Sequence, residues 1–318
     1  MQVIAGTKEF QIGEPTVVTI GKFDGRHKGH QKLLRTMLGF REKDGLRTAI
    51  FTFDMAPAGV VSGKKQALIT TNQERRNNMK RTGIDYLVEY PFNQEVARMS
   101  PEEFVRRILV GQMQAHVIVA GTDCGFGYQR AGNAELLQKL APEYGYKAVI
   151  IEKEQDEHRD ISSTYIREQL DAGHIAKANK LLGEPDAIHG EVVHGNHIGA
   201  SVLGFPTANL LPPPEKYLPR FGVYASRILI DGKYYGGVSN IGAKPTIHGE
   251  NPVGVETFIL GLEPGIDLYG KNIEVQLLDF ERPEQRFGGL EELKARIALD
   301  KQYAAEYFKK HPEWLQNI

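Results

Sequence analysis

The sequence has a single cysteine, Cys124, among 318 residues. One thiol cannot form an internal disulfide, and it cannot supply the thiolate cluster of a structural zinc site. Its neighbours are glycine and apolar residues, whereas a cysteine nucleophile needs a basic environment that favours the thiolate. The composition therefore argues against a disulfide-stabilised, zinc-cluster or thiol-dependent protein.

Neither sign of charge is in excess. Lysine and arginine number 39 against 40 aspartate and glutamate residues, so the formal net charge is -1. Without a global basic field to attract phosphodiester backbones, no nucleic-acid partner is expected. A near-neutral surface is compatible with a monomer or a homo-oligomer.

Long apolar runs are missing as well. No run approaches the ~20 apolar residues of a membrane-spanning helix, and the first residues lack the basic-then-apolar pattern of a secretory leader. We therefore expect a cytoplasmic protein with no membrane contact. A chain of 318 residues suits two domains, each able to bury its own core.

Residues 1–183 alternate short apolar runs with amphipathic stretches, which is typical of strands and helices in a parallel sheet. We predict an α/β domain whose sheet carries helices on both faces. Capping boxes mark two helix starts, Thr71 with Glu74 and Ser100 with Glu103. The predicted strands are residues 17–20, 48–53, 85–90, 116–121 and 148–152, and a further helix is predicted at 162–173.

Near Gly183 the apolar period changes from 3.6 to 2, which predicts a domain boundary there and a β domain over residues 184–318. Asp231 and Gly232 stand between two alternating runs and indicate a hairpin. Residues 271–280 predict a strand with one buried apolar face and with Glu274 and Gln276 on the other. A closing amphipathic helix is predicted at 289–310, with its apolar face formed by Leu290, Leu293, Ile297, Tyr303 and Tyr307.

A glycine-rich turn, GKFDGRHKGH (residues 21–30), separates the first predicted strand from a helix. Open parallel sheets bind ligands beyond the carboxyl ends of their strands, and the N–H groups at a helix start bind anions. His27 and His30 add donors that become cationic as phosphate approaches. The pattern favours phosphate binding over two alternatives, a solvated surface turn and a metal site, for which two histidines supply too few ligands.

GKFDGRHKGH resembles the His-x-Gly-His signature of the nucleotidyltransferase superfamily, in the form typical of bacterial FMN adenylyltransferases. The resemblance implies a Rossmann-like domain in which His27 and His30 bind nucleotide phosphates and stabilise charge on the leaving pyrophosphate. It also implies ligand contacts from Gly21, Phe23, Asp24 and Gly29. For Asp24, ordinary turn chemistry is the alternative.

Two further segments resemble parts of the same superfamily. ISSTYIR (161–167) resembles its second signature, for which a plain helix cap with a solvated arginine is the alternative. GTDCGFGYQRAGN (121–133) resembles the flavin-side loop, although a loop aromatic often serves local packing. The implied contact residues are Ser163, Thr164, Arg167, Asp123, Phe126 and Arg130.

The second half carries another resemblance. GFPTANL (204–210) is similar to the riboflavin kinase signature, which implies that Thr207 and Asn209 bind Mg²⁺ and the ATP phosphates. Gly195 and Gly204 would form a close backbone cradle for those phosphates. A proline–threonine turn is the alternative.

Glu256 falls on the catalytic base of the riboflavin kinase family, where it would take the proton of the riboflavin 5′-hydroxyl. A solvent-facing strand glutamate is the alternative. Segments in the family's order cover nearly all of residues 184–318 and imply an antiparallel β-barrel closed by a C-terminal helix.

The chain departs from the family patterns at five places, one of which is LGLEPGIDLYG (260–270), where an Asp-Phe-rich run is usual. Cys124 stands where a phenylalanine is usual, and residues 53–60 lack the usual Pro-His-Pro element. Ala200 replaces a basic residue, and Phe258 replaces a histidine. None of these changes removes a matched catalytic residue, so we expect activity with altered kinetics.

The chain is thereby identified as a member of the bifunctional bacterial riboflavin kinases/FMN adenylyltransferases, the prokaryotic type of FAD synthetase. The expected partners are Mg²⁺ with ATP, riboflavin and FMN, and FAD is the final product. Three alternatives stay open: another adenylyl- or cytidylyltransferase, an enzyme that keeps one of the two activities, and a flavin- or nucleotide-binding regulator without turnover.

Overall fold

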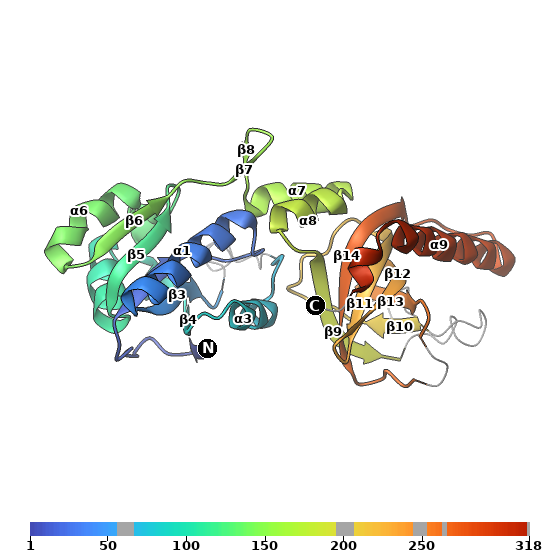
Figure 1. Cartoon of the computed structure of the whole chain (residues 1–318), viewed down its shortest axis with the longest axis horizontal. Coiled ribbons are helices and arrows are strands. Elements are labelled where there is room, and N and C mark those ends of the chain that lie inside the picture. The colour runs from blue at the N-terminus through green and yellow to red at the C-terminus, as the bar shows by residue number, and fades with distance from the viewer. Residues whose placement is uncertain (56–66, 195–206, 244–252, 263–265, 317–318) are drawn as a thin grey trace. The chain divides into compact units, whose positions relative to one another are not determined.

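The structure is a computed structural model that describes residues 1–55, 67–194, 207–243, 253–262 and 266–316 (Figure 1). The chain forms two compact units, Met1–Ser163 and Thr164–Ile318. No helix in the part of the chain that the structure describes is long and apolar enough to cross a membrane.

The two units divide before the predicted boundary at Gly183, because two helices pack with the second unit. They are α7 (Ser163–Ala172) and α8 (Ile175–Leu182). The Asn179 side chain of α8 donates to the Leu277 carbonyl at 2.8 Å. Where one catalytic domain ends and the other begins stays a prediction.

Six parallel strands form the sheet of the first unit, in the order β1-β4-β3-β2-β5-β6. Their bounds are β1 (Gln2–Ala5), β2 (Thr16–Ile20), β3 (Arg47–Phe53), β4 (Tyr86–Tyr90), β5 (Ala115–Gly121) and β6 (Lys147–Ile151). The apolar runs predict the last five of these strands. They miss β1, which lies at the sheet edge and is mostly exposed.

Helices cover both faces of this sheet, which confirms the predicted architecture. One face buries Met37 of α1 and Met79 of α3, and the other buries Leu109 of η1 and Leu137 of α6. The elements between the strands are α1 (Lys28–Asp44), α3 (Asn72–Arg81), α4 (Gln94–Ala97), α5 (Pro101–Glu103), the π-helical η1 (Phe104–Gln112), η2 (Tyr128–Arg130), α6 (Ala134–Tyr144), and the hairpin of β7 (Gln155–Asp156) and β8 (Arg159–Asp160).

One of the two predicted capping boxes is complete. The Glu74 N–H donates to the Thr71 hydroxyl at 3.2 Å, and the Thr71 N–H donates back to the Glu74 carboxylate at 2.8 Å. Ser100 also caps its helix by accepting from the Glu103 N–H. The Glu103 carboxylate pairs with Arg107 at 2.6 Å instead of completing the second box.

The second unit is a closed barrel with the strand order β10-β13-β12-β11-β14-β9, and all its pairs are antiparallel. The strands are β9 (Asp186–Val193), β10 (Thr207–Leu210), β11 (Gly222–Ile230), β12 (Lys233–Ala243), β13 (Val253–Ile259) and β14 (Asn272–Pro283). The predicted hairpin joins β11 to β12. Asp231 and Gly232 have φ values of 50° and 82° there, as a tight hairpin turn requires.

The outer side of β14 differs from the prediction. Its apolar positions are buried as expected, but Glu274 and Gln276 are buried as well. The Arg227 guanidinium bonds to Gln276 and lies 4.9 Å from the ring of Trp314 in η4 (Pro312–Leu315). The C-terminal residues therefore cover a strand face that alternation alone assigns to solvent.

The closing helix α9 (Leu290–Lys310) forms as predicted, and Tyr303 and Tyr307 of the predicted apolar face pack against an apolar cluster of the second unit. Leu290 is 40% exposed, so the predicted apolar row is wrong at its first member. The carboxylate of Asp300 accepts from Arg282 of β14, which joins this side of the helix to the barrel, and from Arg296 one turn earlier on α9. The buried residues of α9 are Asp300, Ala304 and Phe308.

Candidate active sites

The loop after β2 lies at the switch point of the sheet. Successive strands are added on the β3 side of β2 and then on its β5 side, and ligands of such sheets bind at this crevice. Phe23 takes a left-handed conformation with φ 49°, and its ring is fully buried. A Cβ at Gly21 would lie 3.0 Å from that ring, which is a tight contact. Gly21 and Phe23 lie within the turn, and their contact with a ligand stays a prediction.

The two histidines stack on each other at the start of α1. Their ring centroids are 3.7 Å apart, and the ring planes differ by 21°. His27 caps the helix, since its Nδ1 accepts from the His30 N–H at 3.4 Å, and a Cβ at Gly29 would lie 3.2 Å from that same nitrogen. His30 Nδ1 lies 2.9 Å from the Gly25 carbonyl and donates to it. These bonds assign the remaining proton of neutral His27 to Nε2.

Burial lowers the pKa of both imidazoles. It lowers the pKa of His27 to about 2, with a further contribution from His30. The pKa of His30 falls to about 4, since burial outweighs the opposing effects of the Gly25 carbonyl and of Asp24 and Asp123. Both rings are therefore neutral at pH 7 without ligand. A phosphate group placed beside them would favour their protonation.

The low pKa values of His27 and His30 should make the protein less stable in acid. Above pH ~6.5 both histidines are neutral in the folded and the unfolded chain, so their burial does not make the free energy of unfolding depend on pH there. Below that value the unfolded chain binds protons that the folded site refuses, and stability falls by about 1.4 kcal/mol per pH unit for each histidine. Urea unfolding at pH 7, 6 and 5 should show this loss, with a smaller slope for His27→Asn. Equal slopes for the two proteins would count against these pKa values.

Asp24 and Ser163 link the two sequence signatures of the first unit. The Asp24 carboxylate accepts from the Thr70 N–H, and the Thr70 hydroxyl accepts from the Gly25 N–H, both at 3.2 Å. The Ser163 hydroxyl donates to the Asp24 carbonyl at 2.6 Å. The two signature segments are therefore in contact, as predicted, through Ser163. Asp24 is buried and its carboxylate bonds within the turn, and its contact with a ligand stays a prediction.

A buried ion pair that the sequence analysis did not select supports the same loop. Arg75 of α3 donates to the Glu89 carboxylate at 2.8 Å and to the Lys22 carbonyl at 3.4 Å. The side chains of Arg75 and Glu89 are 4% and 1% exposed. The signal was available in the sequence, because Glu89 is the one charged residue of the otherwise apolar and aromatic strand β4.

Glu89→Gln should destabilise the protein strongly. The Glu89 carboxylate accepts from Arg75 and also from Arg76, so its loss leaves the buried Arg75 guanidinium uncompensated, at a cost of about 3–5 kcal/mol. The matched control is Glu14→Gln, because Glu14 and Arg47 form an exposed pair whose loss should cost at most ~1 kcal/mol. The free energy of unfolding in urea measures both effects. Equal losses for the two variants would refute the structural role given to Glu89.

The loop after β5 holds three of the predicted contact residues in different ways. Asp123 is exposed and pairs with Lys153 at 3.3 Å. Phe126 is buried in the core with its ring centroid 5.7 Å from that of Phe104. Arg130 folds back on its own loop, with Nη2 3.5 Å from the Asp123 carbonyl. Phe126 therefore packs inside the unit, and Asp123 presents its carboxylate at the surface.

Some of the predictions for the first half stay untested. Burial raises the pKa of Cys124 to about 11, so the thiol is protonated at pH 7. Thr164 and Arg167 belong to the second unit, where the Arg167 guanidinium lies 5.2 Å from the Tyr217 ring. Their contact with the triphosphate stays a prediction. The departure at 53–60 lies outside the described residues beyond Met55.

The predicted kinase residues come together on two neighbouring barrel strands. Asn209 of β10 is directly opposite Glu256 of β13, and Thr207 is opposite Phe258. Opposed side chains in an antiparallel pair lie on the same face of the sheet. The Thr207 hydroxyl donates to the Glu256 carboxylate at 2.9 Å. A hydroxyl, an amide and a carboxylate thus share one patch of the barrel's outer face.

The strand register adds Asn240 to this patch. It is the partner of Glu256 on β12, so Glu256 lies between two asparagines. Asn240 was not predicted as a site residue, because only the strand register shows that it is paired with Glu256. Gly195, Gly204 and Ala200 lie outside the described residues. Within the described part of the chain, no group of three or more His, Cys, Asp or Glu side chains is arranged to hold a metal ion.

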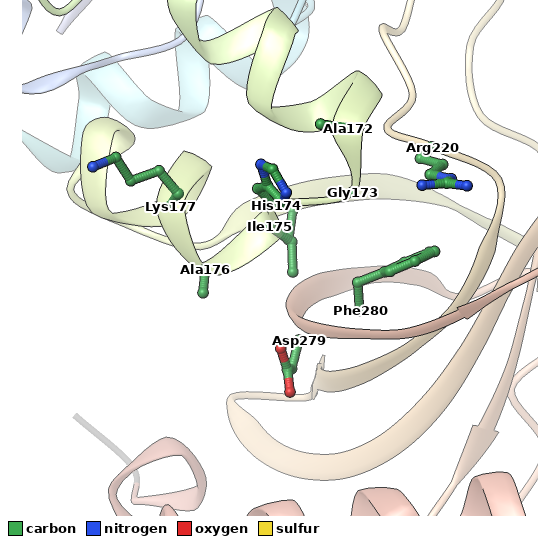
Figure 2. A pocket seen from close by; sticks show the side chains of 9 residues that line it. All are labelled: Ala172, Gly173, His174, Ile175, Ala176, Lys177, Arg220, Asp279 and Phe280. Atoms are coloured by element: carbon green, nitrogen blue, oxygen red, sulfur yellow. The ribbon is translucent and has the colours of Figure 1, made fainter. Parts of the chain in front are cut away.

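A separate cavity of about 560 Å³ lies in the second unit where α8 meets the end of β14. Figure 2 shows its lining, with Arg220 and Phe280 on one side and His174 on the other, while Lys177 extends away from Arg220. The Arg220 guanidinium is 5.5 Å from the Phe280 ring centroid. Among the residues that the structure describes, Thr207, Asn209 and Glu256 do not line this cavity.

Comparison with known proteins gives consistent matches for both units. Residues 9–165 match the family model of FAD synthetase, and residues 182–308 match that of riboflavin kinase. The bifunctional riboflavin kinase/FMN adenylyltransferase of Escherichia coli (strain K12) is 36% identical over 297 residues, which is 93% of each chain. The Bacillus subtilis (strain 168) protein of the same name is 34% identical over 92% of each chain. A crystal structure of a macrolide-efflux protein from Streptococcus pneumoniae has a TM-score of 0.85 and 30% identity, covering 96% of this chain and 98% of that one.

Proposed function

The chain belongs to the family of bifunctional riboflavin kinases/FMN adenylyltransferases, and on this premise we propose which of its residues carry the two reactions. It phosphorylates riboflavin to FMN and transfers the adenylyl group of ATP to FMN, giving FAD and pyrophosphate. Both reactions consume ATP, which fits the cytoplasmic location expected from the sequence.

The adenylyl transfer is assigned to the turn between β2 and α1. A phosphate oxygen of FMN attacks the α-phosphorus of ATP, and the bond to pyrophosphate breaks. His27 offers its Nε2 proton to the phosphates, and His30 gains a second donor once the phosphate charge protonates it. The stacked pair at 3.7 Å is the observation that carries this assignment, since it presents both rings at the switch point of the sheet.

The phosphorylation is assigned to the outer face of β10 and β13. Glu256 accepts the proton of the riboflavin 5′-hydroxyl while the 5′-oxygen of riboflavin attacks the γ-phosphorus of ATP, and ADP leaves. Thr207 donates to the Glu256 carboxylate in the structure and would turn its hydroxyl oxygen toward the phosphates. The 2.9 Å bond between these two side chains carries the assignment.

Thr207 and Asn209 are also the residues that would hold Mg²⁺ with the ATP phosphates. Their hydroxyl and amide oxygens are the hard ligands that this ion prefers, and they lie beside the Glu256 carboxylate. Two protein oxygens are enough for Mg²⁺, because phosphate oxygens and water usually fill the rest of its coordination shell. When bound, Mg²⁺ neutralises charge on the phosphoryl group being transferred.

One incubation tests the assignment of both activities to this chain. The protein is given riboflavin, Mg²⁺ and ATP labelled at either the α- or the γ-phosphate, and the flavins are resolved by chromatography. We expect the γ-label in FMN and both labels in FAD, because the kinase transfers the γ-phosphate and the adenylyltransferase the α-phosphate. FMN without FAD would mean that only the kinase is active. Flavin binding without any product would favour a regulator.

A further inference from the structure

The row of polar residues in the proposed kinase site ends at Asn240. Asn209, Glu256 and Asn240 are opposed residues of β10, β13 and β12, so their side chains lie on one face of the barrel. The next residue of this row is Val223 of β11, which belongs to an apolar cluster shared with α9. Asn240 is half-buried and stands between that cluster and Glu256, with Cβ atoms about 5 Å apart in such an opposed pair. Asn240 therefore closes the row on its β12 side.

A second carboxylate lies beside Asn240. Gly242 comes two positions later on the same face of β12, and a Cβ at Gly242 would overlap the Glu284 carboxylate, whose Oε2 would be 3.0 Å away. Glu284 directly follows β14 and is exposed. The absence of a side chain at Gly242 thus lets this carboxylate approach the strand. Two residues of a strand span roughly 7 Å, which is close enough for one extended ligand to contact both Asn240 and Glu284.

The chemistry of this end of the row differs from that of the other end. Within the described part of the chain, neither the Asn240 amide nor the Glu284 carboxylate forms a hydrogen bond or an ion pair. An amide offers two donors and an acceptor, and a carboxylate accepts strongly from hydroxyl groups. The charge of Glu284 disfavours a phosphate group there, whereas Thr207 and Asn209 at the other end are uncharged. The β12 side of Glu256 therefore suits a neutral ligand that carries hydroxyl groups.

We propose that Asn240 and Glu284 bind the ribityl chain of riboflavin and determine which acceptor the kinase phosphorylates. The inference rests on the proposed role of Glu256 as the base that accepts the 5′-hydroxyl proton. The ribityl chain carries further hydroxyl groups on the carbons next to the reacting one, so a 5′-hydroxyl at Glu256 brings them close to it. With the ATP phosphates assigned to Thr207 and Asn209, these hydroxyl groups lie on the β12 side, where they bond to Asn240 and Glu284.

Asn240→Ala and Glu284→Gln test the proposal. The KM for riboflavin should rise about tenfold in each variant, as expected for the loss of one hydrogen bond, whereas the KM for Mg·ATP should stay unchanged. Calorimetric titration with riboflavin in the presence of Mg·ADP should show the same weakening without turnover. Lumiflavin has the same ring system without a ribityl chain, so its inhibition constant for FMN formation should be the same in the variants and the unmodified protein. Glu306→Gln, at an exposed position of α9, is the matched control for Glu284→Gln and should leave both KM values unchanged.

Several results would overturn the role of Asn240 and Glu284. An unchanged KM for riboflavin in both variants would do so, and an equal rise in the lumiflavin constant would mean that they contact the flavin ring. A rise in the KM for Mg·ATP alone would place the phosphates on the β12 side. A lower melting temperature with unchanged riboflavin binding would mean that the two residues serve the fold alone. The premise is tested separately by Glu256→Gln, which should slow FMN formation at saturating riboflavin, an effect that the other two variants should not share. If Glu256→Gln keeps full kinase activity, another group is the base and the premise fails.

Discussion

His27→Ala should lower the rate of FAD formation from FMN by about 100-fold to 1,000-fold, the usual effect of removing one preorganised donor to developing charge. FMN formation from riboflavin should continue at its normal rate, because the predicted kinase residues lie in the other unit. His27 is neutral and 8% exposed without ligand. The substitution therefore removes a hydrogen-bond donor to the phosphates, but it does not change the charge of the ligand-free site at pH 7. Stopped assays with FMN and Mg·ATP, resolved by chromatography, measure the change.

His27 also caps α1, so alanine has a second effect of about 1 kcal/mol on stability. His27→Asn separates the two roles, because asparagine caps helices well but cannot reproduce an imidazole Nε2 donor. It should be as inactive as His27→Ala and more stable. His116→Ala, which removes an exposed histidine of β5, is the matched control and should keep both activities. If His27→Asn formed FAD normally, His27 would be a helix cap and no more.

Glu256→Gln should reduce FMN formation by about 100-fold to 10,000-fold, the range for losing a general base. The side-chain oxygen of glutamine can accept the same hydrogen bond from the Thr207 hydroxyl that the carboxylate accepts now. The strand geometry should therefore survive while the base is lost. FAD formation from added FMN should be unaffected. Rates from riboflavin and from FMN, measured separately, distinguish the two reactions.

The control for this variant is Glu306→Gln, at an exposed position of α9 in the same unit. It removes the same charge from the same unit at a position outside β10 and its neighbouring strands, and it should leave both rates unchanged. Retained kinase activity in Glu256→Gln would show that another group accepts the proton. Loss of both activities in a folded Glu256→Gln protein would contradict the assignment of each reaction to its own unit.

Local signals in the sequence predict most of the elements, and tertiary packing decides the rest. Buried parallel strands are continuous apolar runs, so β2 to β6 were predictable, whereas the exposed edge strand β1 carries no such pattern. The apolar residues of α9 predict part of its buried face, because Tyr303 and Tyr307 pack against an apolar cluster of the barrel unit. They do not predict the buried Asp300, whose bond to Arg282 of β14 forms only in the folded barrel.

The active-site residues show the same division. Sequence signatures predict the stacked histidines and the three polar residues of β10 and β13, because their spacing within each segment is itself the signal. The residues that hold those segments in place were missed. Arg75 and Glu89 come from separate elements and meet only through the fold.

We propose that the two sites act independently and that FMN passes between them by diffusion. The most direct test mixes His27→Ala protein with Glu256→Gln protein and supplies riboflavin and Mg·ATP. Neither variant should form appreciable FAD alone, whereas the mixture should form it, because FMN released by the first is used by the second. FAD formed from riboflavin by a single variant, or no FAD from a mixture whose members each keep their own reaction, would contradict the claim.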